Sequence, residues 1–510
     1  MSTESISSWN VPTPKPAPLA SYPLNDSERA ERFAKLFAAD FRYVHAWKRW
    51  LLWDGNRWTA DADGAVFRKA QELSPLLASE ALKIDDADKR KKAVWEAVKA
   101  GDKAKIEAMV SLAQNHLAAS PTLFDSNPML LGVSNGVVDL QTGKHRIASR
   151  EDYITKQTNA DYDFAATCEV WKQFLLRVFD GDLELISFVQ RAIGYSLTGL
   201  TVEQCLFFLF GTGSNGKSTF TKFLEALLSA YALKSVSSLY TVSANGRQPL
   251  EEIARLVGKR FVTGSETEEG DDLAESRVKD MTGGDTLTGR ELYCQAFNFE
   301  PSHKLWIYGN HRPNVRGNDH GIWRRIKLIP FRVQISDAEK DPDLSKKLWA
   351  ERSGILNWAI EGCIEWQKHG LGEARAVTDA TTDYREDEDE LGEFIDEMCW
   401  EQGEIERSTL YKAYKDWAEE RGNRYLPKQT TFSKRIGERA GIKGRKSGKK
   451  RYWTGISVRT VEERESRGAT RVSFVDGSTA FVPHRSHNTR AGHLGQENGS
   501  FPQTSLMTKS

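Results

Sequence analysis

The sequence lacks most of the features that assign a protein to a class from its composition. Its five cysteines are far apart, and no two of them form a Cys-x-x-Cys pair. This spacing argues against a zinc ribbon and a disulfide framework, and fits a reducing, cytoplasmic compartment. No apolar run approaches the roughly 20 residues that span a bilayer, and no charged-then-apolar leader opens the chain. We therefore expect neither a membrane anchor nor a signal peptide.

A net charge of one sign is also missing. Lys and Arg number 71, as do Asp and Glu, so the formal net charge is +0. Overall charge therefore says nothing about nucleic acid, and any such signal has to be local. The hydrophobic fraction of 39% is that of an ordinary globular protein.

The composition and the hydrophobic pattern change along the chain and predict five regions. Residues 1–25 are rich in Ser and Pro and residues 459–510 are polar, so we expect both to be disordered. Residues 26–198 are expected to form a mainly helical domain with small β elements. Residues 199–375 alternate short apolar strands with helices, which is typical of an α/β domain with a largely parallel sheet. Residues 395–458 combine two amphipathic helices with a Gly- and Lys-rich hairpin.

Four short apolar segments are the candidate strands of the α/β domain. They are 204–210, 260–265, 304–309 and 325–331. The acidic stretch that follows this domain, from Asp383 to Glu393, is interpreted as the solvated face of a linking helix.

The strongest motif directly follows the first candidate strand and fits the pattern G-x-x-x-x-G-K-[ST]. In such a loop the backbone N–H groups surround phosphates, Lys217 reaches the β/γ oxygens, and the Ser218 hydroxyl ligates Mg²⁺, a role that Thr219 could share. The alternative is a chance glycine turn, but an apolar strand precedes the loop and an amphipathic helix follows it. The predicted nucleotide-binding residues are Gly211, Thr212, Gly213, Ser214, Asn215, Gly216, Lys217, Ser218 and Thr219.

Polar side chains stand at the ends of two further candidate strands. A P-loop ATPase needs a carboxylate there to hold magnesium and to polarise the attacking water, and Glu266 is in place. Glu268 and Glu269 are interpreted as acids that cap a loop. Asn310 can hydrogen-bond both the γ-phosphate and the water, or it can simply form a turn before Pro313.

Two adjacent arginines precede the last candidate strand. Taken alone, Arg324 and Arg325 would be surface residues. Beside a phosphate loop, one of them is a candidate arginine finger, which stabilises charge on the transferred phosphoryl group.

The order of these motifs closely resembles the superfamily three helicases, in particular the phage and plasmid primase-helicase branch that includes the poxvirus primase-helicase. The resemblance covers roughly residues 40–458. Besides the phosphate loop, it rests on Ser265-Glu-Thr-Glu-Glu269, Met281-Thr-Gly-Gly-Asp285, Gly309-Asn-His311 with Pro313, and Trp323-Arg-Arg-Ile326 with Ile329-Pro-Phe331.

The resemblance implies an α/β P-loop (AAA+-like) ATPase core with a mainly helical N-terminal domain and a C-terminal winged-helix domain. It implies catalytic roles for Lys217, Glu266, Asn310 and Arg324, with Arg325 as the fallback finger, and a metal site at Ser218 and Glu266. Many members have two adjacent acids where this chain has Glu266-Thr-Glu268, so the second acid stays open. ATP and Mg²⁺ are the implied cofactors.

The resemblance also implies contacts with DNA. The box from Lys279 to Tyr293 corresponds to a motif that leads into a channel-lining hairpin, and it places Lys279 toward a neighbour's nucleotide. Arg290 can pair with phosphate and Tyr293 can stack on a base, although core packing is an equal alternative for Tyr293.

The 404–458 region resembles a winged helix. Between Lys434 and Arg451 there are nine basic residues and one acid, which favours DNA over a solvated basic surface. Lys443, Arg445 and Lys446 are the candidate contacts.

These patterns predict an ATP-dependent helicase that forms a ring, usually a hexamer, and translocates on single-stranded DNA during phage or plasmid replication. A separate primase or polymerase is a candidate partner, because residues 1–150 leave no room for a primase domain. The alternative is an ATP-gated loading ring that recruits partners without processive unwinding. A generic P-loop kinase is a more distant alternative, since it would not need the Gly283-Gly-Asp285 box or the basic hairpin.

Overall fold

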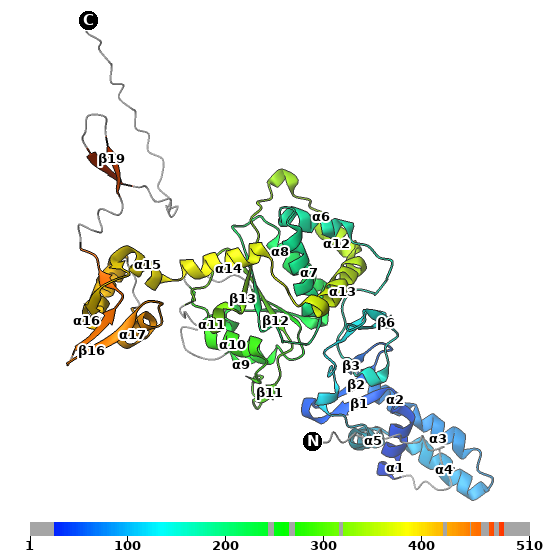
Figure 1. Cartoon of the computed structure of the whole chain (residues 1–510). Helices are drawn as coiled ribbons and strands as arrows, with labels where there is room; N and C mark the ends of the chain where they lie inside the picture. Colours follow the sequence, from blue (N-terminus) through cyan, green and yellow to red (C-terminus); the bar gives the residue numbers. More distant parts are fainter. Residues whose placement is uncertain are drawn as a thin grey trace, which may run out of the picture. The chain divides into compact units, whose positions relative to one another are not determined.

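The computed structural model describes residues 25–242, 249–264, 271–315, 320–421, 426–448, 450–460, 469–473 and 479–483. The chain divides into two compact units, Met1–Glu388 and Asp389–Ser510 (Figure 1). The division falls inside the acidic stretch, between α14 (Arg375–Asp387) and α15 (Glu390–Met398). The predicted disordered arm lies outside the described residues, except for Asn25, whose side chain caps the first helix.

The first part of unit 1 is mainly helical, as the sequence predicts. A three-stranded antiparallel sheet interrupts the helices, and its β2–β3 hairpin turns at Asp54-Gly-Asn56. A second small antiparallel sheet follows, with a turn near residue 135. The elements are α1 (Asp26–Phe37), β1 (Phe41–Val44), β2 (Arg49–Trp53), β3 (Trp58–Ala60), α2 (Ala65–Gln71), α3 (Leu73–Ala81), α4 (Ala87–Lys99), α5 (Lys103–His116), β4 (Leu130–Val133), β5 (Gly136–Asp139) and β6 (Lys144–Arg146).

A five-stranded sheet forms the centre of unit 1. Its strands run in the order β13-β7-β12-β9-β8, and all neighbouring pairs are parallel. The four predicted strands are present as β7 (Leu206–Phe210), β9 (Phe261–Gly264), β12 (Lys304–Gly309) and β13 (Ile326–Pro330). The edge strand β8 (Ala232–Ser235) was not predicted, because this short segment is only partly apolar.

Both faces of this sheet are buried. Successive strand residues point to opposite faces, so Phe207 and Trp306 enter one core while Phe208 and Ile307 enter the other. Such apolar runs are typical of parallel sheets covered by helices on both sides. The first face carries α6 (Glu169–Val178), α7 (Leu183–Leu197), α8 (Lys217–Leu228), α12 (Leu344–Ala350) and α13 (Arg352–His369); the second carries α9 (Leu250–Ala254), α10 (Glu275–Gly283), α11 (His320–Trp323) and α14 (Figure 1).

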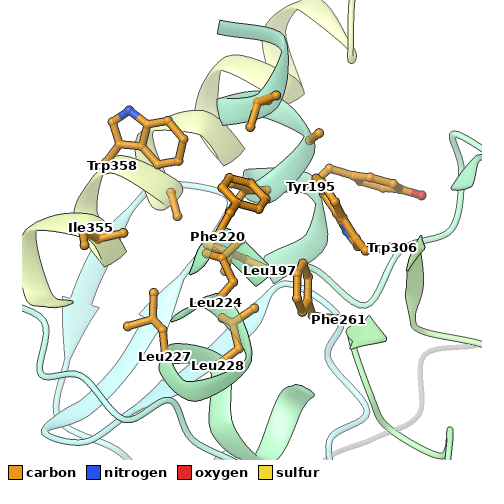
Figure 2. Packing of buried hydrophobic residues seen from close by; sticks show 14 of the residues in the cluster. Tyr195, Leu197, Phe220, Leu224, Leu227, Leu228, Phe261, Trp306, Ile355 and Trp358 are labelled. Atoms are coloured by element: carbon orange, nitrogen blue, oxygen red, sulfur yellow. The ribbon is translucent and has the colours of Figure 1, made fainter. Parts of the chain in front are cut away.

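The core of the first face fixes the helix that follows the predicted phosphate loop. Phe220, Leu224, Leu227 and Leu228 recur at helical spacing along α8 and point into the same cluster as Trp306 (Figure 2). Since Trp306 is fully buried, its truncation to alanine would cost about 3–5 kcal/mol of folding free energy. Packing therefore holds the amino end of α8 at one edge of the sheet.

Unit 2 has its own core. It is made by residues such as Phe394, Tyr414, Phe432 and Trp453. The two predicted helices and the hairpin are all present, and Ala440 lies beyond the second helix and is exposed. The elements besides α15 are β14 (Cys399–Trp400), β15 (Glu404–Glu406), α16 (Arg407–Glu420), α17 (Gln429–Gly437), β16 (Lys443–Ser447), β17 (Lys450–Thr454) and β18 (Ser457–Val458).

Within the described part of residues 459–510, the predicted disordered tail, two strands are present. The strands β19 (Ala469–Ser473) and β20 (Thr479–Pro483) pair antiparallel. A further general result concerns membranes: within the described parts of the chain, none of the helices is both long and apolar enough to cross a bilayer.

Candidate functional site

The candidate site lies at the carboxyl edge of the parallel sheet. Because all five strands run in one direction, the segments that follow β7, β9 and β12 emerge at the same edge. In open α/β sheets this edge is where ligands bind. The glycine-rich loop, defined as residues 211–216, follows β7, and Asn310 directly follows the adjacent strand β12.

The glycine-rich loop has a backbone that only glycine can supply at two positions. A Cβ on Gly211 would lie 2.3 Å from the Phe331 carbonyl oxygen, so any side chain there would displace the backbone after β13. Gly216 has a φ of +89° and precedes α8, and a Cβ on it would meet Val178 Cγ1 at 2.6 Å. The loop thus turns tightly between β7 and α8 and directs the unbonded N–H groups of the first helical turn toward the sheet edge.

Lys217 joins the loop to the end of β12. Its side chain is 4% exposed, and Nζ donates to the carbonyl oxygen of Gly211 at 2.5 Å, to Asn215 Oδ1 at 3.2 Å and to Asn310 Oδ1 at 3.1 Å. These three acceptors are neutral oxygens. The arrangement holds a cation beside the open N–H groups, which is an environment suited to an anionic group such as phosphate.

The remaining loop residues complete this edge. Asn215 Nδ2 donates to the Phe331 carbonyl oxygen at 3.3 Å, and the Ile335 N–H donates to the Ser214 carbonyl oxygen at 2.7 Å, so two contacts fasten the loop to the segment after β13. Ser218 lies in the first turn of α8 and is exposed, whereas Thr219 is half-buried. The nine predicted nucleotide-binding residues therefore form one continuous loop and helix start. Sequence reasoning missed the part played by Phe331, whose contribution is a carbonyl that leaves no sequence signal.

Glu266, the predicted catalytic and metal-binding carboxylate, lies outside the described residues, as do Glu268 and Glu269. The described strand β9 ends at Gly264, where it pairs with Ile307 of β12. Among the residues that the structure describes, no group of three or more His, Cys, Asp and Glu side chains could hold a metal ion.

Two buried cysteines of unit 1 are not reactive thiolates. Burial raises the pKa of the Cys205 and Cys363 thiols to about 12, so both stay protonated.

The two candidate finger arginines lie at the opposite, amino edge of the sheet and differ from each other. Arg325 is buried, and its guanidinium donates to Thr282 Oγ1 at 3.1 Å and to the Gly321 carbonyl oxygen at 2.7 Å. Arg324 is exposed and donates to Gln204 Oε1 at 3.0 Å. A strand of five residues separates them from the carboxyl edge, a distance of about 16 Å, so neither belongs to the Lys217 site of its own chain.

The predicted DNA-contact segment forms a hairpin. Helix α10 ends at Gly283, and β10 (Leu287–Gly289) pairs antiparallel with β11 (Phe297–Phe299). Arg290 is exposed at the start of the connecting loop, and Tyr293 is 98% exposed within it. Core packing was therefore the wrong alternative for Tyr293. Lys279 is half-buried on α10 and lies outside the hairpin loop.

In unit 2 the three predicted DNA contacts share one strand. Lys443, Arg445 and Lys446 lie on β16, which is exposed along its length and pairs with β17. Arg445 is engaged by Glu404, with Nη2 at 2.7 Å from Oε1.

Three family models match the chain, one after another. "D5 N terminal like" matches residues 30–180, "Family of unknown function (DUF5906)" matches residues 209–325, and "Poxvirus D5 protein-like" matches residues 386–461. Two of the three carry the D5 name, one toward each end of the chain. The resemblance to the poxvirus type of primase-helicase, predicted from the sequence, is thereby confirmed.

The curated relatives belong to large DNA viruses. A candidate helicase, L207/L206, of Acanthamoeba polyphaga mimivirus is 28% identical over 318 residues, which are 58% of this chain and 33% of that protein. A candidate helicase, 022R, of Frog virus 3 is 27% identical over 297 residues, which are 52% and 30% of the two chains. A candidate primase, C962R, of African swine fever virus is 25% identical over 326 residues, which are 58% and 33%. The match thus spans about a third of the length of these relatives.

Among solved structures, the apo C-terminal region of NrS-1 aligns with 85% of this chain and 100% of its own, with a TM-score of 0.44 and 13% identity.

Proposed function

We propose that this chain is an ATP-hydrolysing DNA helicase of superfamily three, which acts as a ring on single-stranded DNA during replication. The observation that carries the proposal is Lys217, held at the carboxyl edge by contacts with both the glycine-rich loop and Asn310. An ammonium group, a helix amino end and a polar amide meet there, as phosphoryl transfer requires. The viral helicase and primase names of the relatives support the same class of function.

The strand order supports a P-loop ATPase core. β12 lies between β7 and β9, so Asn310 is next to the phosphate loop, while β9, the strand that precedes Glu266 in the sequence, lies one strand farther away. In this arrangement Lys217 binds the β/γ oxygens of ATP and Asn310 orients the attacking water. Ser218 and Glu266 would hold Mg²⁺, which neutralises charge on the phosphates when bound.

The position of Arg324 supports a ring. An exposed arginine at the amino edge cannot serve its own nucleotide, but it can reach the nucleotide of a neighbouring copy. Arg325 is committed to Thr282 and Gly321, which favours Arg324 as the finger. We therefore place the ATP sites between subunits of a homo-oligomer, with six subunits as the expected number.

Two exposed elements are the proposed DNA contacts. The hairpin loop offers Arg290 for a phosphate and the fully exposed ring of Tyr293 for a base. Unit 2, with α16, α17 and the basic β16–β17 hairpin, is assigned as a winged helix that binds the DNA backbone through Lys443, Arg445 and Lys446.

The alternative is a ring that binds ATP in order to load onto DNA and to recruit a primase or polymerase, without processive unwinding. The test is the rate of ATP hydrolysis with and without single-stranded DNA, for the wild type, Lys217→Ala, Arg324→Ala and an equimolar mixture of the two variants. Lys222→Ala is the matched control, because Lys222 is an exposed lysine on the same helix.

We expect DNA to stimulate the wild type and the control, and each site variant alone to be inactive. The mixture should regain part of the activity, because an intact Lys217 from one subunit can meet an intact Arg324 from the other. Full activity of Arg324→Ala, or hydrolysis that ignores DNA, would overturn the motor assignment and favour the loading ring.

A further inference from the structure

Helix α4 has one buried face and one unpartnered face. It packs against α3 through Ala97, which is buried, and the Ser74 hydroxyl donates to the Ala97 carbonyl oxygen at 2.8 Å. On the other side Trp95 is 54% exposed and Val98 is 63% exposed. Trp95 and Val98 therefore present apolar surface that the contact with α3 leaves uncovered.

Three lysines are close to Trp95 along the helix. Lys91 and Lys92 precede it by four and three residues, and Lys99 follows it by four, so all three share its side of the helix. Lys99 Nζ lies 3.5 Å from the centroid of the indole ring. None of the three lysines forms an ion pair with any residue that the structure describes. We name Lys91, Lys92, Trp95 and Lys99 the Trp95 face.

Two acids of this helix segment, Asp86 and Glu96, are engaged away from Trp95. Asp86 is the N-cap and accepts from the N–H groups of Asp88 and Lys89. Glu96 pairs with Arg29 of α1 at 3.3 Å. Asp88 lies in the first turn, about two turns before Trp95. Asp88 is exposed and lies on the same side of α4 as Trp95, at the amino end, so the three lysines outnumber the acids on this side of the helix.

We infer that the Trp95 face binds single-stranded nucleic acid, with the lysines on phosphates and the indole stacked on a base. Positive charge beside an accessible aromatic ring is the arrangement by which proteins bind single strands without sequence preference. An acidic peptide would satisfy the lysines, but Asp and Glu side chains offer no planar ring to stack on Trp95. The site lies outside the hairpin and unit 2, and its binding needs no ATP, so it does not rest on the proposed motor activity.

The test is equilibrium binding of a fluorescein-labelled oligothymidylate to the full chain without nucleotide, over a range of salt concentrations. The variants are Lys91→Gln/Lys92→Gln/Lys99→Gln, Trp95→Ala and Trp95→Phe. The matched control is Lys340→Gln/Lys346→Gln/Lys368→Gln, which removes the same charge from exposed lysines elsewhere in unit 1. Circular dichroism checks that each variant is folded.

The triple lysine variant should lower the slope of log affinity against log salt by about 2, because each phosphate that is no longer neutralised lowers it by about 0.7. Trp95→Ala should weaken binding about tenfold, and Trp95→Phe should restore most of that affinity. Ultraviolet cross-linking to a bromouracil oligonucleotide should label the peptide that contains Trp95. Binding and slope equal to those of the control, without a cross-link at this peptide, would overturn the inference. Weaker binding of polyglutamate but unchanged binding of the oligonucleotide would assign the face to an acidic protein instead.

Discussion

The two edges of the central sheet each bury a lysine, and the two lysines have different surroundings. At the carboxyl edge, Lys217 reaches across an open loop to a carbonyl and two side-chain amides. At the amino edge, Lys304 begins β12 and donates to the carbonyl oxygens of Thr198, Leu200 and Ser302. Burial lowers the pKa of Lys304 well below its usual value. Burial of a lysine therefore does not by itself identify a ligand site. The glycines and the accessible N–H groups around Lys217 distinguish the carboxyl edge as the ligand site.

The amino edge shows a second contrast, between an arginine used inside the fold and one presented outside it. Arg325 is enclosed by Thr282 and Gly321, whereas Arg324 is exposed. The comparison of the two edges therefore predicts which substitutions remove activity and which remove stability.

The largest expected effect is at Arg324. Arg324→Ala should lower DNA-stimulated ATP hydrolysis about a thousandfold, the usual contribution of an arginine finger, with an unchanged thermal midpoint. Arg325→Ala should instead lower the thermal midpoint of unfolding, because it leaves buried acceptors without a donor. Each unsatisfied acceptor costs about 1–3 kcal/mol of folding free energy. Phosphate release and differential scanning fluorimetry measure the two effects. Equal losses of stability in both variants would remove the distinction between the two arginines.

The next effect compares the two lysines. Lys217→Ala should lower hydrolysis at least about a hundredfold, because it removes a cation aimed at the transferred phosphate. Lys304→Met should leave the rate per folded molecule near that of the wild type but lower the thermal midpoint, since three carbonyl oxygens lose their donor. A stable Lys304→Met variant without activity would show that the amino edge has a chemical role.

The sequence was sufficient to predict the strands that carry the site, because each is a mainly apolar run that stops at glycine or a polar residue. It predicted the loop from Gly211 to Thr219 because the spacing of such loops is dictated by phosphate. It missed β8, an edge strand that contains Lys234 and is too weakly apolar to recognise. Burial at this edge strand is partial, so little apolar sequence is needed to form it.

The roles of adjacent arginines could not be separated from sequence. Arg324 and Arg325 differ in exposure because Thr282, which is distant in the sequence, and Gly321, in the preceding helix, accept hydrogen bonds from Arg325 and enclose it. The exposure of Tyr293 was equally inaccessible, because an aromatic residue flanked by Leu292 and Cys294 has the composition of a core segment. Only the hairpin geometry places it outside.

The folding stability should depend on pH through a histidine at the amino edge of the sheet. His303 is buried, neither ring nitrogen has a hydrogen-bond partner among the described residues, and burial lowers its pKa to about 3. Below about pH 6.5 the His303 imidazole is protonated in the unfolded chain but stays neutral in the folded chain. The free energy of unfolding therefore falls by about 1.4 kcal/mol per pH unit between about pH 6.5 and 3. His303→Leu should remove this contribution. Thermal midpoints of both proteins at pH 7.5, 6.5 and 5.5 measure it, and parallel curves would contradict it.

The smallest expected effects are changes in DNA affinity caused by substitutions in unit 2. On β16, one basic side chain forms an ion pair and another does not. Arg445 is held by Glu404, whereas Lys446 makes no ion pair within the described residues. Lys446→Gln should weaken DNA binding about threefold at moderate salt, the usual effect of one phosphate contact.

Glu404→Gln should strengthen DNA binding by a similar factor, because it releases the Arg445 guanidinium and removes a negative charge beside the strand. The double variant Glu404→Gln/Arg445→Gln, which keeps the net charge of the wild type, is the control. If the net charge of unit 2 alone determines the DNA affinity, the double variant should bind DNA as tightly as the wild type. If the released guanidinium contacts phosphate, Glu404→Gln should also steepen the salt dependence, by about 0.7 for a single strand or 0.9 for a duplex. Fluorescence anisotropy over a salt series separates these outcomes, and an unchanged affinity in Glu404→Gln would exclude Arg445 from the DNA interface.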